Sequence, residues 1–218
     1  MTEMTSRLPV ELGEPAPDFA LPAVDREGIV SLADYRGRTS LLVALFRGLY
    51  CPFCRRSVVQ LGLVRDKLRA AGVDALGIVG TTPENARRYF RFRPTRLPLA
   101  ADPQLATHRA YGAPRPPVTP QLLEDLRTVR ANPTGELPAP LPIMEVVPAL
   151  DRLDGFTPTD TDHQDETSQF PQLEGQFLID RDGIVRWRNI EGARDGLAGL
   201  GRFPGEAELL AAAQAVAG

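Results

Sequence analysis

The sequence predicts an α/β protein built on a mixed β-sheet that helices cover on both faces. Two continuous apolar runs, residues 39–46 and 73–79, flank a segment whose apolar residues recur with helical spacing. Further along, residues 176–189 hold two strand-like runs around the dipeptide Asp182-Gly183. A strand, a helix and a strand in succession predict parallel pairing, whereas Asp-Gly between two strands predicts an antiparallel hairpin.

The first three elements follow from their apolar patterns. Residues 39–46, TSLLVALF, are apolar almost throughout, which is typical of a strand buried on both faces. Residues 52–71 predict a helix that stops before Gly72. Its apolar positions recur at intervals of three and four: Cys54, Val58, Leu61, Val64 and Leu68. Residues 73–79 form the second strand, so the unit is a right-handed parallel crossover.

Later helices are predicted from their caps. Thr82 is a suitable N-cap and Pro83 suits the first helical turn. The segment ADPQLATHRAYG has the same pattern and predicts another helix, with Asp102 as N-cap, a proline after it and Gly112 at the C-terminal end. Residues 204–218, PGEAELLAAAQAVAG, predict a final amphipathic helix.

Residues 113–170 do not fit this alternation. They contain ten of the 21 prolines, too many for regular elements, apart from one short predicted helix at about residues 119–129. The acidic TDTDHQDETSQ that follows Pro158 is interpreted as a solvated or mobile loop. A long irregular connection is uncommon inside a compact domain. We therefore expect a single domain, residues 1–218, with an insertion that covers the surface beside the active site or forms a disordered spacer.

Composition excludes several classes of function. The chain has 218 residues, 43% of them hydrophobic, and a formal net charge of −3. This balance gives no reason to expect nucleic acid as a partner. No segment approaches the roughly 20 apolar residues of a membrane span, and residues 1–19 lack a secretory signal pattern. A cytoplasmic location is expected, where structural disulfides are rare.

The two cysteines of the chain, Cys51 and Cys54, open the predicted long helix. Cys51 is then the N-cap and Cys54 the third helical residue, where unpaired amides and the helix dipole favour a thiolate. We expect a thiol pKa lowered from about 8.5 toward 7 or below. Arg55 and Arg56 in the first turn oppose the dipole, so they either face a thiolate or point into solvent.

Other interpretations of the pair are weaker. A zinc site needs a second pair of ligands, and the two histidines, His108 and His163, are far apart in sequence. Two buried inert cysteines remain an alternative. A disulfide closing so small a ring restrains the unfolded chain weakly, which suits a reversible electron carrier better than a structural crosslink. Neither a metal nor a cofactor is predicted.

Several segments in order carry a family resemblance: GEPAPDFALP, DREGIVSLADYRG, an apolar strand before a cysteine at a helix start, ADPQLATHRAYG and FLIDRDGIVRW. In this order the sequence resembles the peroxiredoxin group, the alkyl hydroperoxide reductase and thiol-specific antioxidant family of the thioredoxin-like superfamily. The resemblance covers about residues 12–112 and 176–216. It implies a thioredoxin-like fold and cysteine-based reduction of peroxides or disulfides.

The active-site segment departs from the family pattern of Pro, three residues, Thr, two residues and the attacking Cys. In this register Arg47 replaces the Pro, Cys51 the Thr, and Cys54 is the attacker. The thioredoxin register instead makes Cys51 the attacker, and we favour Cys51 because a cap position faces outward. The family's peroxide-polarising Arg aligns with Glu174, so Arg47 is its candidate substitute. Glu191, within RWRNIEGARDG, is expected on a solvated face.

Three hypotheses for function follow. The favoured one is a thiol peroxidase with Cys51, Cys54 and Arg47 as catalytic residues, reduced again by a thioredoxin- or glutathione-type donor. The second is a protein disulfide reductase using the same pair. The third is a non-catalytic interaction domain that binds a partner through the proline-rich insertion. Relatives of the peroxiredoxin group commonly pair, so a homodimer is a candidate assembly.

Overall fold

The computed structural model describes residues 8–217. The prediction that residues 1–19 hold no secretory signal falls in part on residues 1–7, which lie outside the described residues. No helix within residues 8–217 combines the length and the apolar character needed to cross a membrane.

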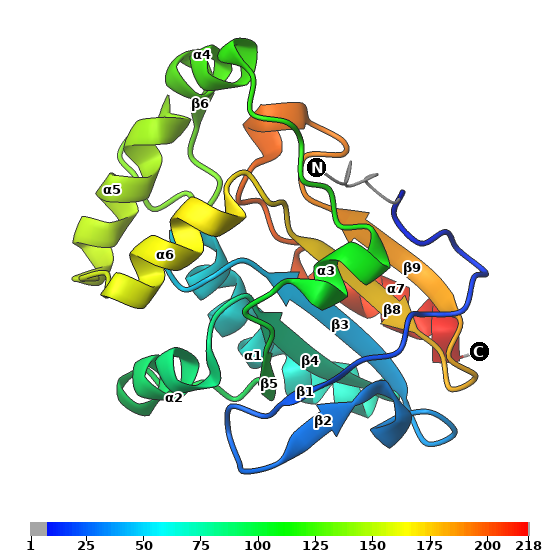
Figure 1. The fold of residues 1–218 in the computed structure, drawn as a ribbon. Coiled ribbons are helices and arrows are strands. Elements are labelled where there is room, and N and C mark those ends of the chain that lie inside the picture. The colour runs from blue at the N-terminus through cyan, green and yellow to red at the C-terminus, as the bar shows by residue number, and fades with distance from the viewer. Residues whose placement is uncertain (1–7, 218) are drawn as a thin grey trace, which may run out of the picture.

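A mixed five-stranded sheet forms the centre of the fold, in the order β5-β4-β3-β8-β9 (Figure 1). Its strands are β3 (Ser40–Phe46), β4 (Val73–Val79), β5 (Leu99–Ala101), β8 (Gly175–Ile179) and β9 (Val185–Ile190). β3, β4 and β5 are parallel, whereas β8 and β9 run antiparallel and form the predicted hairpin. The predicted mixed sheet, parallel crossover and hairpin are confirmed.

Side chains of β3 point alternately into two apolar cores, because successive residues of a strand face opposite sides of the sheet. Leu42, Ala44 and Phe46 belong to the core shared with α1 (Pro52–Ala70) and α7 (Glu206–Ala217). Leu41, Val43 and Leu45 belong to the core on the other face. Burial on both faces explains why β3 has an uninterrupted apolar sequence.

The second core is covered mainly by the N-terminal part of the chain and by α3. Its covering elements are β1 (Ala20–Pro22), β2 (Ile29–Ser31), the 3₁₀ turn η1 (Leu32–Asp34) and α3 (Ala106–Tyr111). Figure 1 shows α3 on the opposite side of the sheet from α1 and α7. The predicted helix after Thr82 is present as α2 (Pro83–Phe92), with Thr82 accepting a hydrogen bond from the N–H of Asn85. Helices therefore cover both faces, as predicted.

The short helix predicted at about residues 119–129 is confirmed as α4 (Pro120–Thr128), but the prediction that the rest of residues 113–170 lacks regular elements is wrong. The region also contains β6 (Arg130–Ala131), β7 (Leu141–Pro142), α5 (Ile143–Asp154) and α6 (Asp160–Gln169), which gather with α4 at one end of the molecule (Figure 1). Prolines do not prevent this, because Pro120 occupies the first position of α4 and Pro142 the N-cap of α5, where no helical N–H is lost. Only Pro148 lies inside a helix.

The acidic segment after Pro158 is helix α6 rather than a solvated loop. Thr159 begins it with a capping box, in which the side chains of Thr159 and Asp162 satisfy each other's backbone N–H groups. Asp162, Asp165 and Gln169 are buried, and Asp162 accepts a 2.9 Å hydrogen bond from the side chain of Asn85 on α2. Because one side of α6 faces the protein, a polar sequence forms a docked helix there.

The insertion packs against the helix that carries the cysteines. Leu137, Val146 and Leu150 are buried in the same core as α1. At the other end, Gln169 accepts a hydrogen bond from the N–H of Gly48 and donates one to the carbonyl of Gly80. The expectation of a disordered spacer is therefore wrong, and the alternative of a cover beside the cysteine segment describes the structure.

Candidate active site

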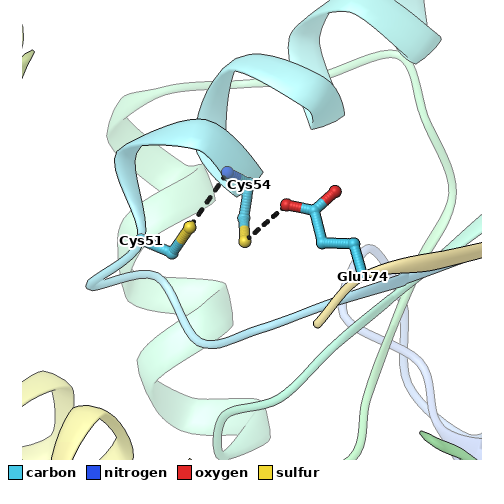
Figure 2. Close-up of side chains that lie close together, drawn as sticks. All are labelled: Cys51, Cys54 and Glu174. Atoms are coloured by element: carbon cyan, nitrogen blue, oxygen red, sulfur yellow. Dashed lines mark hydrogen bonds between the residues drawn. The ribbon is translucent and has the colours of Figure 1, made fainter. Parts of the chain in front are cut away.

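The cysteine pair lies at the N-terminus of α1, just after the central strand β3. Cys51 is the N-cap, with φ −81°, and Pro52 is the first helical residue. The Sγ atom of Cys51 accepts a 3.3 Å hydrogen bond from the backbone N–H of Cys54 (Figure 2). A sulfur therefore takes the place of the usual capping oxygen, and the predicted capping geometry is confirmed.

Both cysteines are free and buried. Cys51 is 4% exposed and Cys54 is 2% exposed, so exposure does not distinguish them. The expectation that the cap position faces outward is wrong, because the segment is enclosed by the core and by the insertion. A preference for either sulfur as the attacking atom has to come from hydrogen bonding and charge.

The carboxyl group of Glu174 lies directly against Cys54. Glu174 is the residue before β8, and its side chain points toward the helix start (Figure 2). The Cys54 thiol donates a 3.0 Å hydrogen bond to Glu174 Oε1. Glu174 is 3% exposed. The residue that sequence comparison aligned with an arginine thus brings a buried carboxyl group to the redox pair.

Arg47 joins the pair to the carboxyl groups. Its Nε lies 3.5 Å from Cys54 Sγ, and its terminal nitrogens lie 3.3 Å from Glu174 Oε1 and 3.0 Å from Glu191 Oε1. A fourth bond, 3.0 Å long, reaches the carbonyl of Gln172. The structure thus brings Cys51, Cys54 and Arg47 together; their catalytic roles stay predictions.

Glu191 is a site residue that the sequence interpretation missed. It is 4% exposed rather than solvated, and it accepts hydrogen bonds from Arg47, from the N–H of Glu174 at 3.0 Å and from the N–H of Gly201 at 2.7 Å. The hairpin register pairs Gly175 with Ile190, so Glu174, just before β8, lies opposite Glu191, just after β9. Counting back from the Asp-Gly turn gives the one sequence signal that places Glu191 beside Glu174.

The surroundings lower the pKa of Cys51. Burial alone raises the pKa of this thiol, but hydrogen bonding from Cys54 and the positive charge of Arg47 outweigh burial and lower the pKa to about 6. At neutral pH Cys51 is therefore largely a thiolate. Thiolates, not thiols, are the nucleophiles of cysteine chemistry.

The surroundings act in the opposite direction on Cys54 and Glu174. Burial, followed by the hydrogen bond to Cys51 and the charges of Cys51 and Glu174, raises the pKa of Cys54 well above its usual value. Burial and then the charge of Glu191 raise the pKa of Glu174 to about 8. At neutral pH the site therefore holds the Cys51 thiolate, the Cys54 thiol and a protonated Glu174.

Arg55 and Arg56 face neither a thiolate nor solvent. Arg55 contacts Asp151 at 2.6 Å and Asp154 at 2.7 Å, and Arg56 contacts Asp154 at 2.8 Å. Arg56 also contacts Glu136 of the insertion at 2.7 Å. Both expectations for these arginines are wrong, because carboxylates of the insertion offset their charge and fasten α5 to the first turn of α1.

Three potential metal-binding atoms, from Cys51, Cys54 and Glu174, lie within 4.8 Å of one another. A tetrahedral structural site needs four ligands, and this cluster of described residues offers three. Arg47 also places a fixed positive charge against two of the three groups, which opposes binding of a dication. We interpret the cluster as a redox and acid–base site; the expectation that the chain holds no metal stays a prediction.

The two histidines do not belong to the cluster that Cys51, Cys54 and Glu174 form among the described residues. His108 is fully buried, and burial lowers its pKa to about 4, so it is neutral at physiological pH. His163 is exposed on α6. Neither residue shares a hydrogen bond with the cysteines in the part of the chain that the structure describes.

A mixed sheet flanked by helices, with a cysteine pair opening the helix after its central strand, defines the thioredoxin-like class of thiol oxidoreductases. The AhpC/TSA family matches residues 12–188, and the chain belongs to this family. A putative peroxiredoxin of Mycobacterium tuberculosis is 34% identical over 116 residues, which cover 52% of this chain and 69% of that protein. The peroxiredoxin Bcp of Escherichia coli K12 is 37% identical over 94 residues, covering 43% and 59% respectively.

A solved structure supports the fold. The peroxidoxin BcpB of Mycobacterium tuberculosis superposes with a TM-score of 0.57 at 14% identity, covering 94% of this chain and 97% of that one. The predicted family, thioredoxin-like fold and thiol-dependent oxidoreductase class are confirmed. The hypothesis of a non-catalytic interaction domain is therefore not carried forward.

Proposed function

We propose that this chain reduces small hydroperoxides through a dithiol–disulfide cycle in which Cys51 attacks and Cys54 resolves. The Cys51 thiolate attacks one peroxide oxygen, the O–O bond breaks, and Cys51 becomes a sulfenic acid. The departing alkoxide takes a proton and leaves as an alcohol, or as water when the oxidant is hydrogen peroxide. Arg47 stabilises the negative charge of the site throughout.

The opposite pKa shifts of the two sulfurs carry the assignment. Cys51 has a pKa lowered to about 6, whereas the pKa of Cys54 is raised. Cys54 is also a hydrogen-bond donor to Glu174, which requires its proton. The peroxiredoxin register favours Cys54 as attacker, but a buried protonated thiol is a poor nucleophile. Cys51 is therefore the better attacking residue.

The second half of the cycle regenerates the dithiol. The Cys54 sulfur attacks the Cys51 sulfenic acid, the S–O bond breaks, an S–S bond forms and water leaves. Two thiols of a thioredoxin- or glutathione-type donor then reduce the disulfide by exchange and are themselves oxidised to a disulfide. No cofactor takes part in this scheme.

Burial of the pair favours a small oxidant. Both cysteine residues are at most 4% exposed, α5 packs against α1, and α6 is hydrogen-bonded to the segment just before Cys51. A hydroperoxide is small enough to approach such a site after a small movement. A folded protein disulfide must bring a sulfur to about 2 Å from Cys51 to exchange, which requires the insertion to move aside. The disulfide reductase remains the second candidate, supported by the CPFC pair and by Glu174 in place of the family arginine.

Three further expectations accompany this function. A cytoplasmic location is the expected one, because thiol donors keep protein dithiols reduced there. We treat residues 1–218 as a single domain, because the insertion shares the core of α1. A homodimer is the candidate assembly, which sedimentation of the reduced and oxidised protein measures directly.

Separate Cys51→Ser and Cys54→Ser variants test the proposal. With hydrogen peroxide, Cys54→Ser should consume one equivalent and retain a sulfenic acid on Cys51, detected as a dimedone adduct by mass spectrometry. Cys51→Ser should react no faster than a model thiol. A dimedone adduct on Cys54 in Cys51→Ser would contradict Cys51 as the attacking residue. If peroxide oxidises the dithiol no faster than a model thiol, while a protein disulfide oxidises it rapidly, the proposed peroxidase function is wrong.

A further inference from the structure

The resolving step raises a question about a proton. Cys54 has to lose its proton as it attacks, yet its side chain is 2% exposed, and water has little access to the sulfur. In the part of the chain that the structure describes, Cys54 Sγ is hydrogen-bonded to Arg47 and Glu174. The guanidinium of Arg47 is already fully protonated. Cys51, the other neighbour of Cys54, is a neutral sulfenic acid at this step. Glu174 is therefore the contacting group able to receive the proton.

The position of Glu174 suits contact with both sulfurs. One of its carboxyl oxygens and the two Sγ atoms all lie within 4.8 Å of one another. The charged or titratable groups that face it are Cys51 and Cys54 on α1, Arg47 after β3 and Glu191 after β9. Arg47 lies 3.0 Å from Glu191 and 3.3 Å from Glu174, so it contacts both carboxyl groups. Among the described residues, Glu174 is the one of the two that is also hydrogen-bonded to a cysteine sulfur, so it is the carboxyl group placed to exchange a proton with the pair.

We propose that Glu174 is a catalytic residue that stores the proton of the redox cycle, protonated in the dithiol state and ionised in the disulfide state. Oxidation by peroxide rests on the proposed function. The change in protonation of Glu174 between dithiol and disulfide does not, because any oxidant of the pair produces it. Because the negative charge moves from Cys51 to Glu174 when the pair is oxidised, the buried cluster keeps the same net charge in both states.

The atoms balance in the oxidation. When the Cys51 thiolate attacks the peroxide, the alkoxide released from the O–O bond takes the Glu174 proton, which leaves a sulfenic acid, an alcohol and a carboxylate. The carboxylate then accepts the Cys54 proton as the S–S bond forms. It passes this proton to the hydroxide released from the S–O bond, which leaves as water. The products are a disulfide and an ionised Glu174.

The reduction reverses the charge transfer. Two donor thiols contribute two protons and two electrons, and they leave as the donor disulfide. Cys51 returns to its thiolate, one proton returns to Cys54 and the other to Glu174. Over the whole cycle a hydroperoxide and two thiols give an alcohol, water and a disulfide, and Glu174 ends as it began.

Electrostatics support the timing of these transfers. The Cys51 thiolate is one of the charges that raise the pKa of Glu174, after burial and Glu191. Oxidation of Cys51 to a neutral sulfenic acid removes this charge. Glu174 then ionises more readily, at the step in which Cys54 needs a base. The amide side chain of a Glu174→Gln variant cannot ionise, so it cannot accept the Cys54 proton.

Infrared difference spectroscopy of the whole chain tests the inference without kinetics. The reduced-minus-oxidised spectrum of the wild type should contain the C=O band of a protonated carboxylic acid, and Glu174→Gln should lack it. Oxidation of the pair is achieved with a disulfide reagent as well as with hydrogen peroxide. Presence of the band in Glu174→Gln, or its absence in the wild type, overturns the inference.

Kinetics provide the second measurement. In Glu174→Gln we expect the Cys51 sulfenic acid to persist about 100-fold longer, the scale of general acid–base catalysis. The matched control is Glu145→Gln, which removes an exposed carboxyl group on α5 and should resolve like the wild type. Circular dichroism checks that both variants fold. Resolution of the sulfenic acid in Glu174→Gln at the wild-type rate overturns the role.

The two proposals fail in different ways. If peroxide oxidises the pair no faster than it oxidises a model thiol, the thiol peroxidase proposal fails, while the band produced by the disulfide reagent still reports on Glu174. If peroxide reacts rapidly but the carboxylic acid band does not change between states, the proposed function stands and the role of Glu174 fails.

Discussion

The guanidinium of Arg47 lies 3.0 Å from the carboxylate of Glu191, although 144 residues separate them in the sequence. Both side chains are nearly buried, at 11% and 3% exposure. The pair fastens the loop after β3 to the end of β9. It also fixes a positive charge beside the dithiol, so one contact contributes to both the fold and the reactivity.

Replacement of Arg47 by Met should lower both the stability of the fold and the reactivity of the dithiol. The pKa of Cys51 rises, because the charge of Arg47 is one of the causes that lower it. The buried Glu191 loses its partner, which costs about 3–5 kcal/mol of unfolding free energy at neutral pH. Denaturant unfolding and the alkylation rate of Cys51 measure these effects.

The control for Arg47→Met is Arg186→Met. This variant breaks the ion pair between Arg186 and Asp180, in which the arginine side chain is 48% exposed. An exposed pair of this kind contributes less than about 1 kcal/mol. Equal losses of unfolding free energy in the two variants would show that the buried Arg47–Glu191 pair stabilises the fold no more than an exposed ion pair does.

Alkylation of the dithiol should depend on pH in a way that distinguishes the sulfurs. The pKa of Cys51 is about 6, so its reaction with iodoacetamide should rise between pH 5 and pH 7 and then level off. Cys54 should remain unmodified over this range because its pKa is raised. Mass spectrometry of the labelled peptide assigns the site. A rise centred near the ordinary thiol value of about 8.5, or labelling of Cys54 first, contradicts the assignment.

Asp154 should control access to the pair from the insertion. It receives hydrogen bonds from Arg55 at 2.7 Å and from Arg56 at 2.8 Å and 2.9 Å. In Asp154→Asn one of the two α5 carboxylates that contact the first turn of α1 loses its charge, at a cost of about 1–3 kcal/mol, and Asp151 remains. A bulky maleimide should then label Cys51 faster than in the wild type.

Glu145→Gln is the matched control for Asp154, since Glu145 is exposed on the same helix α5. The comparison uses reduced protein at one pH and one reagent concentration. If maleimide labels Asp154→Asn and the wild type at the same rate, the insertion does not limit access to Cys51.

Asp165 should make stability depend on pH. It is buried on α6, burial raises its pKa to about 6, and its Oδ2 has no hydrogen-bond partner among the described residues. Because the folded-state pKa exceeds the unfolded one, the stabilising contribution is complete below about pH 4 and is lost as the pH rises through about 6. Asp165→Asn should gain about 1–2 kcal/mol over the wild type at pH 8, after allowance for solvent screening.

Denaturant unfolding at pH 5 and pH 8 measures this difference. The exposed Asp160 on the same helix supplies the control variant Asp160→Asn. The advantage of Asp165→Asn should shrink toward pH 5, where the wild-type carboxyl group becomes protonated. An advantage that is constant with pH points to a packing effect instead.

Elements with a strong local pattern could be predicted from the sequence. The apolar runs of β3 and β4, the helical spacing of α1 and the Asp-Gly turn before β9 depend on neighbours within a few residues. The same holds for Cys51 as N-cap, because a cap is satisfied by the first turn of its own helix.

The insertion shows where local patterns mislead. Its prolines suggested irregular structure, yet Pro142 stands at the N-cap of α5, where a proline is compatible with the start of an α-helix. The sequence of α6 has no apolar face, so periodicity gave no signal for it. Asn85 and Gly48, both more than 70 residues away, supply the hydrogen bonds that dock it.

The sequence by itself determined the central sheet, the family and the place of the cysteine pair at a helix start, because each depends on short patterns and their order. Tertiary structure decided which sulfur is ionised and which carboxyl group holds a proton. Those properties depend on burial and on charges a few ångströms apart, and Arg47, Glu174 and Glu191 become neighbours only when β8 and β9 pair beside β3.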